Sequence, residues 1–170
     1  PQEGKSQRIS RAFLLWMLLR DHDLRLGVAS YELSTARRWG RTVRNDIRSH
    51  PDFGLTVARD SSAASEWSLA GDDVHGSVYS VGIGGALTGR PLDGLIIDDP
   101  VKDRAQAESE TYRDAAWDWW TDVARTRLAP GGWVVVVMTR WHEDDLAGRL
   151  IADNPDGWTV VNIPAQADHD

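Results

Sequence analysis

Three short segments, far apart in the chain, contain the residue types that phosphate chemistry requires. The first, Gly4-Lys5-Ser6, matches the second half of the phosphate-loop pattern G-x-x-x-x-G-K-[ST]. In that pattern the glycine lets the backbone approach a phosphate, the lysine neutralises the outer phosphates and the hydroxyl ligates magnesium. Apolar residues at helical spacing follow, among them Ile9 and Phe13. They predict a helix whose N-terminal amides would favour a bound anion.

The second segment is a pair of adjacent carboxylates at the end of an apolar run. Leu95, Ile96 and Ile97 are typical of a strand that is buried on both faces, and Asp98 and Asp99 follow directly. Acids at the end of a buried strand require a cation or a hydrogen-bond network, because burying an unpaired charge is costly. The alternative interpretation is an ordinary acidic turn opened by Asp-Pro.

The third segment is the apolar run from Trp133 to Met138, which is the most pronounced buried strand pattern in the chain and ends at Thr139. His142 and Asp144 follow, at the expected start of a helix. Acids are favoured at a helix start by the macrodipole alone. A metal site at His142 therefore stays an alternative to this simpler explanation.

The segments between these groups alternate between strand and helix patterns. The expected strands are 24–30, 95–97, 133–138 and 158–163, the expected helices are 9–17, 30–45, 103–128 and 144–152, and three short strands at 55–58, 65–69 and 76–81 form an antiparallel excursion. This order predicts an α/β fold with a mainly parallel central sheet flanked by helices. Ligands bind such sheets outside the carboxyl ends of the strands, so the three segments should meet there.

Nucleotide hydrolysis is the chemistry that this combination would perform. Lys5 and Mg²⁺ would neutralise the charge of the transferring phosphoryl group. We expect Ser6 and Asp98 to hold the magnesium, Asp99 to position the attacking water, and Thr139 to sense the γ-phosphate by hydrogen bonding.

Composition limits the remaining classes of protein. The 170 residues fit one domain, contain no cysteine for a disulfide, a thiolate metal site or a thiol nucleophile, and include no apolar run long enough to cross a membrane. The net charge of −7 argues against a surface that binds DNA everywhere. It leaves room for one basic stripe, formed by Arg37, Arg38, Arg41, Arg44 and Arg48, which is either a solvated helix face or a nucleic-acid contact.

Two further features have more than one interpretation. The glycine-dense segment Gly82–Arg90 is a loop, either a nucleotide-sensing or subunit-contacting loop or a plain crossover connection. Trp117, Trp119 and Trp120 would suit base stacking, but core packing is favoured because a long helix needs a buried face.

In these motifs the chain resembles the large subunit of tailed-phage terminases, the motor that packages DNA into procapsids. The resemblance lies in PQEGKSQRIS (residues 1–10, Walker A), GLIIDDPVKDR (94–104, Walker B with the catalytic acid) and VVVVMTRWHEDDLAGRL (134–150, the coupling motif), and it extends over essentially all 170 residues. It implies an ATPase domain of the additional-strand, catalytic-acid P-loop class. The cofactors would be ATP and Mg²⁺, with the nucleotide held by Gln2, Glu3, Gly4, Lys5, Ser6 and Gln7.

The resemblance also implies an assembly. Such motors work as homo-oligomeric rings on double-stranded DNA, with a terminase small subunit and a portal protein, in the host cytoplasm and transiently docked on the procapsid. Family members present an arginine to the neighbouring subunit's ATP, and Arg90 is our candidate by its position. The family's catalytic acid is often Glu, whereas Asp99 is one methylene shorter. A first strand is expected before Pro1 and an RNase H-like nuclease domain after Asp170.

Three other functions remain as alternatives. A metal-dependent nuclease or hydrolase built on Asp98, Asp99 and His142 would leave the Gly-Lys-Ser segment without a role. A DNA-binding module would use the arginine-rich helix alone, and another P-loop motor, such as a helicase, would share the hydrolysis chemistry.

Overall fold

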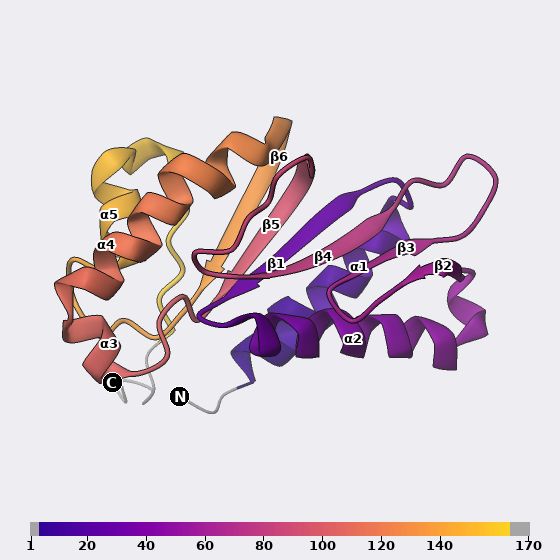
Figure 1. The fold of residues 1–170 in the computed structure, drawn as a ribbon, viewed down its shortest axis with the longest axis horizontal. Helices are drawn as coiled ribbons and strands as arrows, with labels where there is room; N and C mark the ends of the chain where they lie inside the picture. The colour runs from indigo at the N-terminus through magenta and orange to yellow at the C-terminus, as the bar shows by residue number, and fades with distance from the viewer. Residues whose placement is uncertain (1–3, 164–170) are drawn as a thin grey trace, which may run out of the picture.

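The strands form one six-stranded sheet in the computed structural model, which describes residues 4–163 (Figure 1). They are β1 (Arg25–Ser30), β2 (Val57–Ser62), β3 (Glu66–Leu69), β4 (Ser77–Gly82), β5 (Leu92–Asp98) and β6 (Leu128–Val137). Their order across the sheet is β2-β3-β4-β1-β5-β6. The neighbouring strands β4 and β1, β1 and β5, and β5 and β6 run parallel. β3 is antiparallel to both β2 and β4. The predicted α/β fold with a mainly parallel sheet is therefore confirmed.

Helices cover both faces of this sheet. One layer contains the π-helix η1 (Gln7–Phe13), which continues as α1 (Leu14–Arg20), and α2 (Leu33–Ser49) followed by the 3-10 turn η2 (Pro51–Phe53). The other contains α3 (Arg104–Glu108), α4 (Glu110–Asp118), η3 (Trp119–Ala124), η4 (Arg125–Arg127), α5 (Leu146–Asp153) and η5 (Pro155–Gly157). Among the described residues, no helix is long and apolar enough to cross a membrane.

Each helix layer has its own apolar core against the sheet. On one face Leu14 and Val43 pack with Val28 and Ile96. On the other face the buried residues are Ala29, Val81, Leu87, Leu92, Leu95, Ile97, Trp119, Trp120, Ala124, Leu146 and Leu150. Trp119 and Trp120 therefore belong to the core, as favoured, and are not exposed for base stacking.

The second helix layer is less regular than the sequence predicts. A single helix over 103–128 was expected, but the chain breaks at Ser109, whose ψ of 119° is extended. After α4 the chain continues as the π-helix η3 and then as the 3-10 helix η4 before β6 begins at Leu128. Periodicity did not reveal this break because the apolar spacing continues across Ser109.

Two strand predictions also differ from the structure. The predicted strand 158–163 has no strand hydrogen bonding, and Val160, Val161 and Ile163 are exposed, because none of the described strands pairs with this segment. The run Trp133–Met138, expected to be fully buried, forms the second half of β6 as far as Val137, and because β6 lies at the edge of the sheet its valines are only half-buried.

The predicted antiparallel excursion is present, with one addition. β2, β3 and β4 form an antiparallel meander, and β4 also pairs in parallel with β1. The glycine-dense segment then crosses from the carboxyl end of β4 to the amino end of β5. It connects these two strands and is anchored by the buried side chain of Leu87, while its role as a subunit-contacting loop stays a prediction.

Candidate functional site

The carboxyl ends of β1, β5 and β6 meet the start of the first helix at one edge of the sheet (Figure 1). Gly4 has a φ of +73°, a conformation that favours glycine, and its carbonyl accepts the first helical hydrogen bond from the Arg8 amide at 3.0 Å. The turn at Gly4 therefore places Lys5 and Ser6 at the beginning of the helix. Parallel strands then deliver Asp98, Asp99 and Thr139 to the same edge.

The ammonium group of Lys5 links two of the predicted residues. Its Nζ donates to Thr139 Oγ1 at 3.0 Å and lies 3.8 Å from Asp99 Oδ1. The side chains of Lys5 and Asp99 are 30 % and 45 % exposed, so the cluster is open to a ligand. A lysine held between a hydroxyl and a carboxylate at a helix start is placed to transfer its hydrogen bonds to a phosphate.

Asp98 is the buried member of the pair and is bound by two hydroxyls. Ser6 Oγ donates to Asp98 Oδ1 at 2.8 Å and Ser10 Oγ donates to Asp98 Oδ2 at 2.9 Å. Asp98 is 2 % exposed. The sequence interpretation did not include Ser10, although its position four residues after Ser6 puts both hydroxyls on the same helix face.

Burial is the main influence on the pKa of Asp98. Desolvation raises the pKa of the Asp98 carboxyl, hydrogen bonds from Ser6 and Ser10 lower it, and the charge of Asp99 raises it further. Two neutral hydroxyls do not compensate a buried negative charge fully, which leaves a carboxylate that a cation would stabilise.

Asp99 has an unusual backbone conformation that turns its side chain away from the strand. Its φ is +46°, in the left-handed region that few residues other than glycine, asparagine and aspartate adopt. The turn is held by two backbone hydrogen bonds, one from the Asp99 amide to Val137 at 2.8 Å and one from the Tyr31 amide to Asp99 at 3.1 Å. This arrangement explains how adjacent acids serve different positions, with Asp98 buried and Asp99 exposed.

The residues present fit a magnesium ion. Mg²⁺ prefers oxygen ligands and is usually bound by one or two carboxylates together with phosphate oxygens and water. Ser6 Oγ and Asp98 Oδ1 lie side by side and supply two such oxygens, and a cation beside them would offset the burial that raises the pKa of Asp98. Magnesium in this place would neutralise charge on the phosphates.

Four of the predicted residues are not at this cluster or lie outside the described part. Gln2 and Glu3 fall outside the described residues. Arg90 lies before the amino end of β5, and the seven residues of that strand separate it from Asp98 by roughly 20 Å. Gln7 is exposed at the start of the helix and accepts from Arg11 at 3.4 Å.

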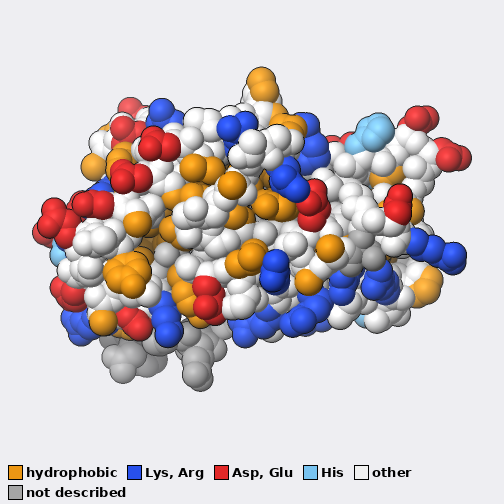
Figure 2. Space-filling view, viewed as in Figure 1, with side chains coloured by type: hydrophobic (Ala, Val, Ile, Leu, Met, Phe, Trp, Pro, Cys, Tyr) orange, Lys and Arg blue, Asp and Glu red, His pale blue; other side chains and the backbone are white. Residues whose placement is uncertain are grey.

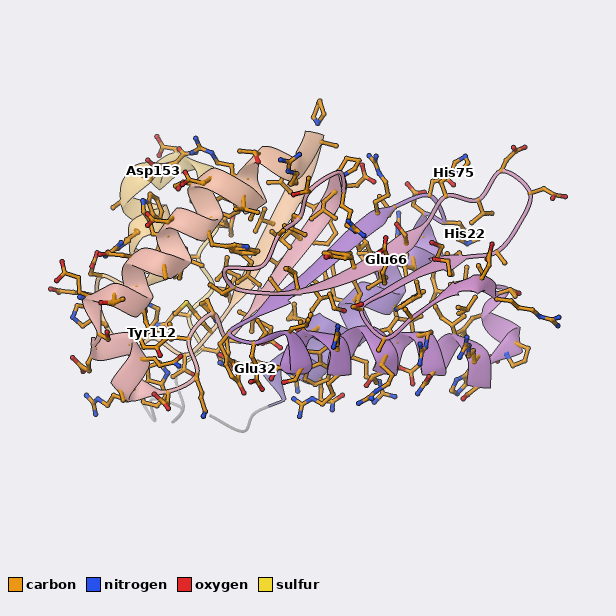
Figure 3. All side chains as sticks on the ribbon, viewed as in Figure 1. His22, Glu32, Glu66, His75, Tyr112 and Asp153 are labelled. Carbon is orange, nitrogen blue, oxygen red and sulfur yellow. The ribbon has the colours of Figure 1, made fainter. Side chains whose placement is uncertain are left out.

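Arg90 has its own partners on β3 and β4. Its guanidinium donates to Glu66 at 2.7 Å and lies 4.5 Å from the ring centre of Tyr79. Glu32 precedes α2 and follows the carboxyl end of β1, so it marks the side of the sheet where the nucleotide site lies. Figure 3 shows Glu66, the partner of Arg90, well away from Glu32. The structure therefore does not bring Arg90 to the nucleotide site of its own chain.

The alternative metal site at His142 is not formed. His142 Nδ1 accepts from the Asp144 amide at 3.0 Å. The Asp144 carboxylate binds Arg149 at 2.6 Å and Arg113 at 3.2 Å, and these contacts lower its pKa to about 2. Within residues 4–163 no three potential metal ligands of the His, Cys, Asp or Glu type cluster together.

The fold is shared with solved structures of phage large terminases. The crystal structure of the HK97 bacteriophage large terminase superimposes with a TM-score of 0.63 at 16% identity, over 99% of this chain and 35% of that one. The large terminase from a thermophilic bacteriophage gives a TM-score of 0.55 at 15% identity, over 92% of this chain and 36% of that one. This chain thus spans about a third of the length of each.

A comparison of the sequence with protein families shows the family of the chain. A family model for the N-terminal part of the T4-like virus type of terminase large subunit matches residues 1–170. The chain belongs to this terminase large-subunit family, as the sequence motifs indicated. No curated protein matches it.

Proposed function

We propose that this chain hydrolyses ATP with Mg²⁺ as the motor domain of a terminase large subunit that moves double-stranded viral DNA into a procapsid. The observation that supports this most is the meeting of Lys5, Ser6, Asp98, Asp99 and Thr139 at one edge of the sheet. The family match supports a packaging motor in preference to a helicase or a DNA-binding module.

Each residue has a distinct part in the proposed reaction. Lys5 binds the outer phosphates, since its ammonium group stands at the helix start. Ser6 and Asp98 hold magnesium. Asp99 orients the attacking water, and Thr139 contacts the γ-phosphate beside Lys5.

The remaining parts of the proposal concern the assembly. The chain works in a homo-oligomeric ring with a small subunit and a portal protein, in the host cytoplasm and docked transiently on the procapsid. Arg90 acts in trans on the nucleotide of a neighbouring subunit, because its own site lies at the other edge of the sheet. To do so it must leave Glu66, which it contacts at 2.7 Å in the single chain.

Replacement of Lys5 by Ala in the full-length protein tests the hydrolysis. We expect phosphate release from ATP to fall at least about 100-fold, as when one charge-stabilising donor is removed from an active site. Arg8→Ala removes one exposed positive charge from the same helix and should have little effect. Unchanged hydrolysis in Lys5→Ala would contradict the proposal and favour the metal-dependent alternative.

A further inference from the structure

The solvent face of α2 carries a row of arginines that the hydrolysis site does not use. The members of this α2 arginine stripe are Arg37, Arg41, Arg44 and Arg48. Steps of four, three and four residues place them on one face of the helix. Arg37, Arg41 and Arg48 are exposed and Arg44 is half-buried. The eleven residue steps from Arg37 to Arg48 correspond to about 16 Å of helix axis.

Three of the four arginines of this stripe are not paired with acids of the described residues. Within residues 4–163, Arg37, Arg41 and Arg48 form no ion pair with an acid. The single acid of α2, Asp46, is bound by Arg11 through hydrogen bonds of 2.8 and 2.9 Å. These three arginines therefore carry positive charge that no acid of the described residues pairs, on a protein with a net charge of −7.

Like charges within the stripe also act on one another. Burial lowers the pKa of the Arg44 guanidinium, and the charges of Arg48 and Arg41 lower it further. Figure 2 shows Lys and Arg side chains gathered along the lower edge, where Figure 1 places α2, and acids gathered at the far end over α3 and α4. An anion bound along the stripe would relieve this repulsion.

The chemistry of the face distinguishes between kinds of partner. Protein interfaces depend on aromatic and apolar anchors, but none of the large exposed apolar residues in the described chain lies on α2. Single-stranded nucleic acids are bound through exposed aromatic rings on which bases stack. The one aromatic residue of α2, Trp39, is only 5 % exposed. Guanidinium groups without such anchors match a phosphate backbone.

We propose that the α2 arginine stripe binds the phosphate backbone of double-stranded DNA without reading its sequence. Measured along the duplex axis, its length of about 16 Å corresponds to about five phosphates of one strand, which rise about 3.4 Å each. The arginines themselves account for a preference for phosphates. That the phosphates are those of DNA, and not of another duplex, rests on the proposed function.

Binding of a fluorescent 30-base-pair DNA duplex to the full-length protein, without nucleotide and at several salt concentrations, tests this surface. The variant Arg41→Ala/Arg48→Ala should bind about tenfold more weakly at 150 mM salt and lower the slope of log K against log salt by about two. The matched control is Arg104→Ala/Arg125→Ala, which removes two exposed arginines at the acidic end. The control should bind as the parent protein does.

Further variants distinguish the loss of a DNA contact from a loss of folding. Arg41→Lys/Arg48→Lys should restore most of the affinity, and each of Arg37→Ala, Arg41→Ala and Arg48→Ala should lower the salt slope by about one. Equal affinities and slopes for the stripe and control double variants would overturn the proposal. So would single-stranded DNA binding as tightly as the duplex. The proposal would also be overturned if the stripe double variant bound DNA as the parent does but sedimented with a different mass. That result would assign the stripe to contact with a second copy of the chain.

ATP hydrolysis measured in parallel separates this inference from the proposed function. The stripe variants should retain the basal rate, because α2 supplies no side chain to the hydrolysis site. Loss of DNA binding with retained hydrolysis supports the stripe. A parent protein that binds duplex through the stripe but hydrolyses no ATP would refute the proposed function alone.

Discussion

Lys5 Nζ lies 3.0 Å from Thr139 Oγ1, although 134 positions separate the two residues in the chain. One belongs to the start of the first helix and the other lies just after β6. Their contact exists because β6 pairs in parallel with β5 and ends at the same edge of the sheet. A phosphate bound at the helix start would lie within reach of both side chains, and this relationship underlies the predictions below.

Replacement of Asp99 by Asn should abolish turnover and leave ATP binding intact. The amide keeps the size of the side chain and tolerates the φ of +46°, but it cannot accept a proton from water. We expect phosphate release to fall about 100-fold to 10,000-fold, which is the contribution of a general base. Binding of a fluorescent ATP analogue should change less than threefold or so, as Asp99 does not hold the phosphates. Retained hydrolysis in this variant would refute the assignment.

Thr139→Val tests the contact between Thr139 and the γ-phosphate. Valine keeps the shape and removes the hydroxyl, so one hydrogen bond is lost, worth about 0.5–1.5 kcal/mol. We expect kcat to decrease roughly twofold to tenfold. Binding of ADP, which lacks the γ-phosphate, should be unaffected in a titration. A selective loss of ADP affinity would place Thr139 elsewhere in the site.

The two ends of β5 should respond in opposite ways when an aspartate is made neutral. Burial raises the pKa of Asp98, so its charged form destabilises the fold at neutral pH. Asp98→Asn should therefore leave the melting temperature unchanged or raise it by about 2–4 °C, while magnesium-dependent turnover is lost.

Asp93 at the start of β5 is the matched control. Arg25 holds the pKa of Asp93 below its usual value through hydrogen bonds of 2.8 and 2.9 Å. Asp93→Asn should lower the stability by about 1 kcal/mol and preserve turnover. Thermal melts and phosphate release measured on both variants check the pair, and the same sign of stability change in both would contradict this account.

The stability contributed by Asp144 should be lost only in strong acid. Arg149 and Arg113 lower the pKa of this carboxyl from 3.8 to about 2. A carboxyl with a depressed pKa in the folded state stabilises the protein above its unfolded pKa, and this stabilisation disappears as the pH falls from about 4 to about 2. Arg149→Met keeps the apolar stem and removes the partner of Asp144 and also of Asp114, which Arg149 contacts at 2.8 Å, so it provides the reference for both contacts.

Urea unfolding at several pH values measures this effect. The difference in free energy of unfolding between the parent and Arg149→Met should be constant from pH 7 to about pH 4 and should shrink below that value. A difference that stays constant down to about pH 2.5 would show that Asp144 is not the group responsible.

Most of the site could be predicted from the sequence. The residues in Gly4-Lys5-Ser6 and in the Asp98-Asp99 pair have specific chemical uses, and the apolar runs before the acids and before Thr139 fix two strand ends. Because the carboxyl ends of parallel strands share one edge, these local patterns were sufficient to bring the groups together.

The tertiary structure alone decided the contacts that depend on relative placement. Only the packing of η1 against β5 gives Asp98 its second hydroxyl from Ser10, and only the hydrogen bonds to β6 and from Tyr31 hold Asp99 at a positive φ. Local sequence patterns predict which residues alternate or repeat along one element, but not which neighbour covers them. For the same reason the valines of β6 were predicted to be buried and are half-exposed at the sheet edge, and the contact of Arg90 with Glu66 was not predicted.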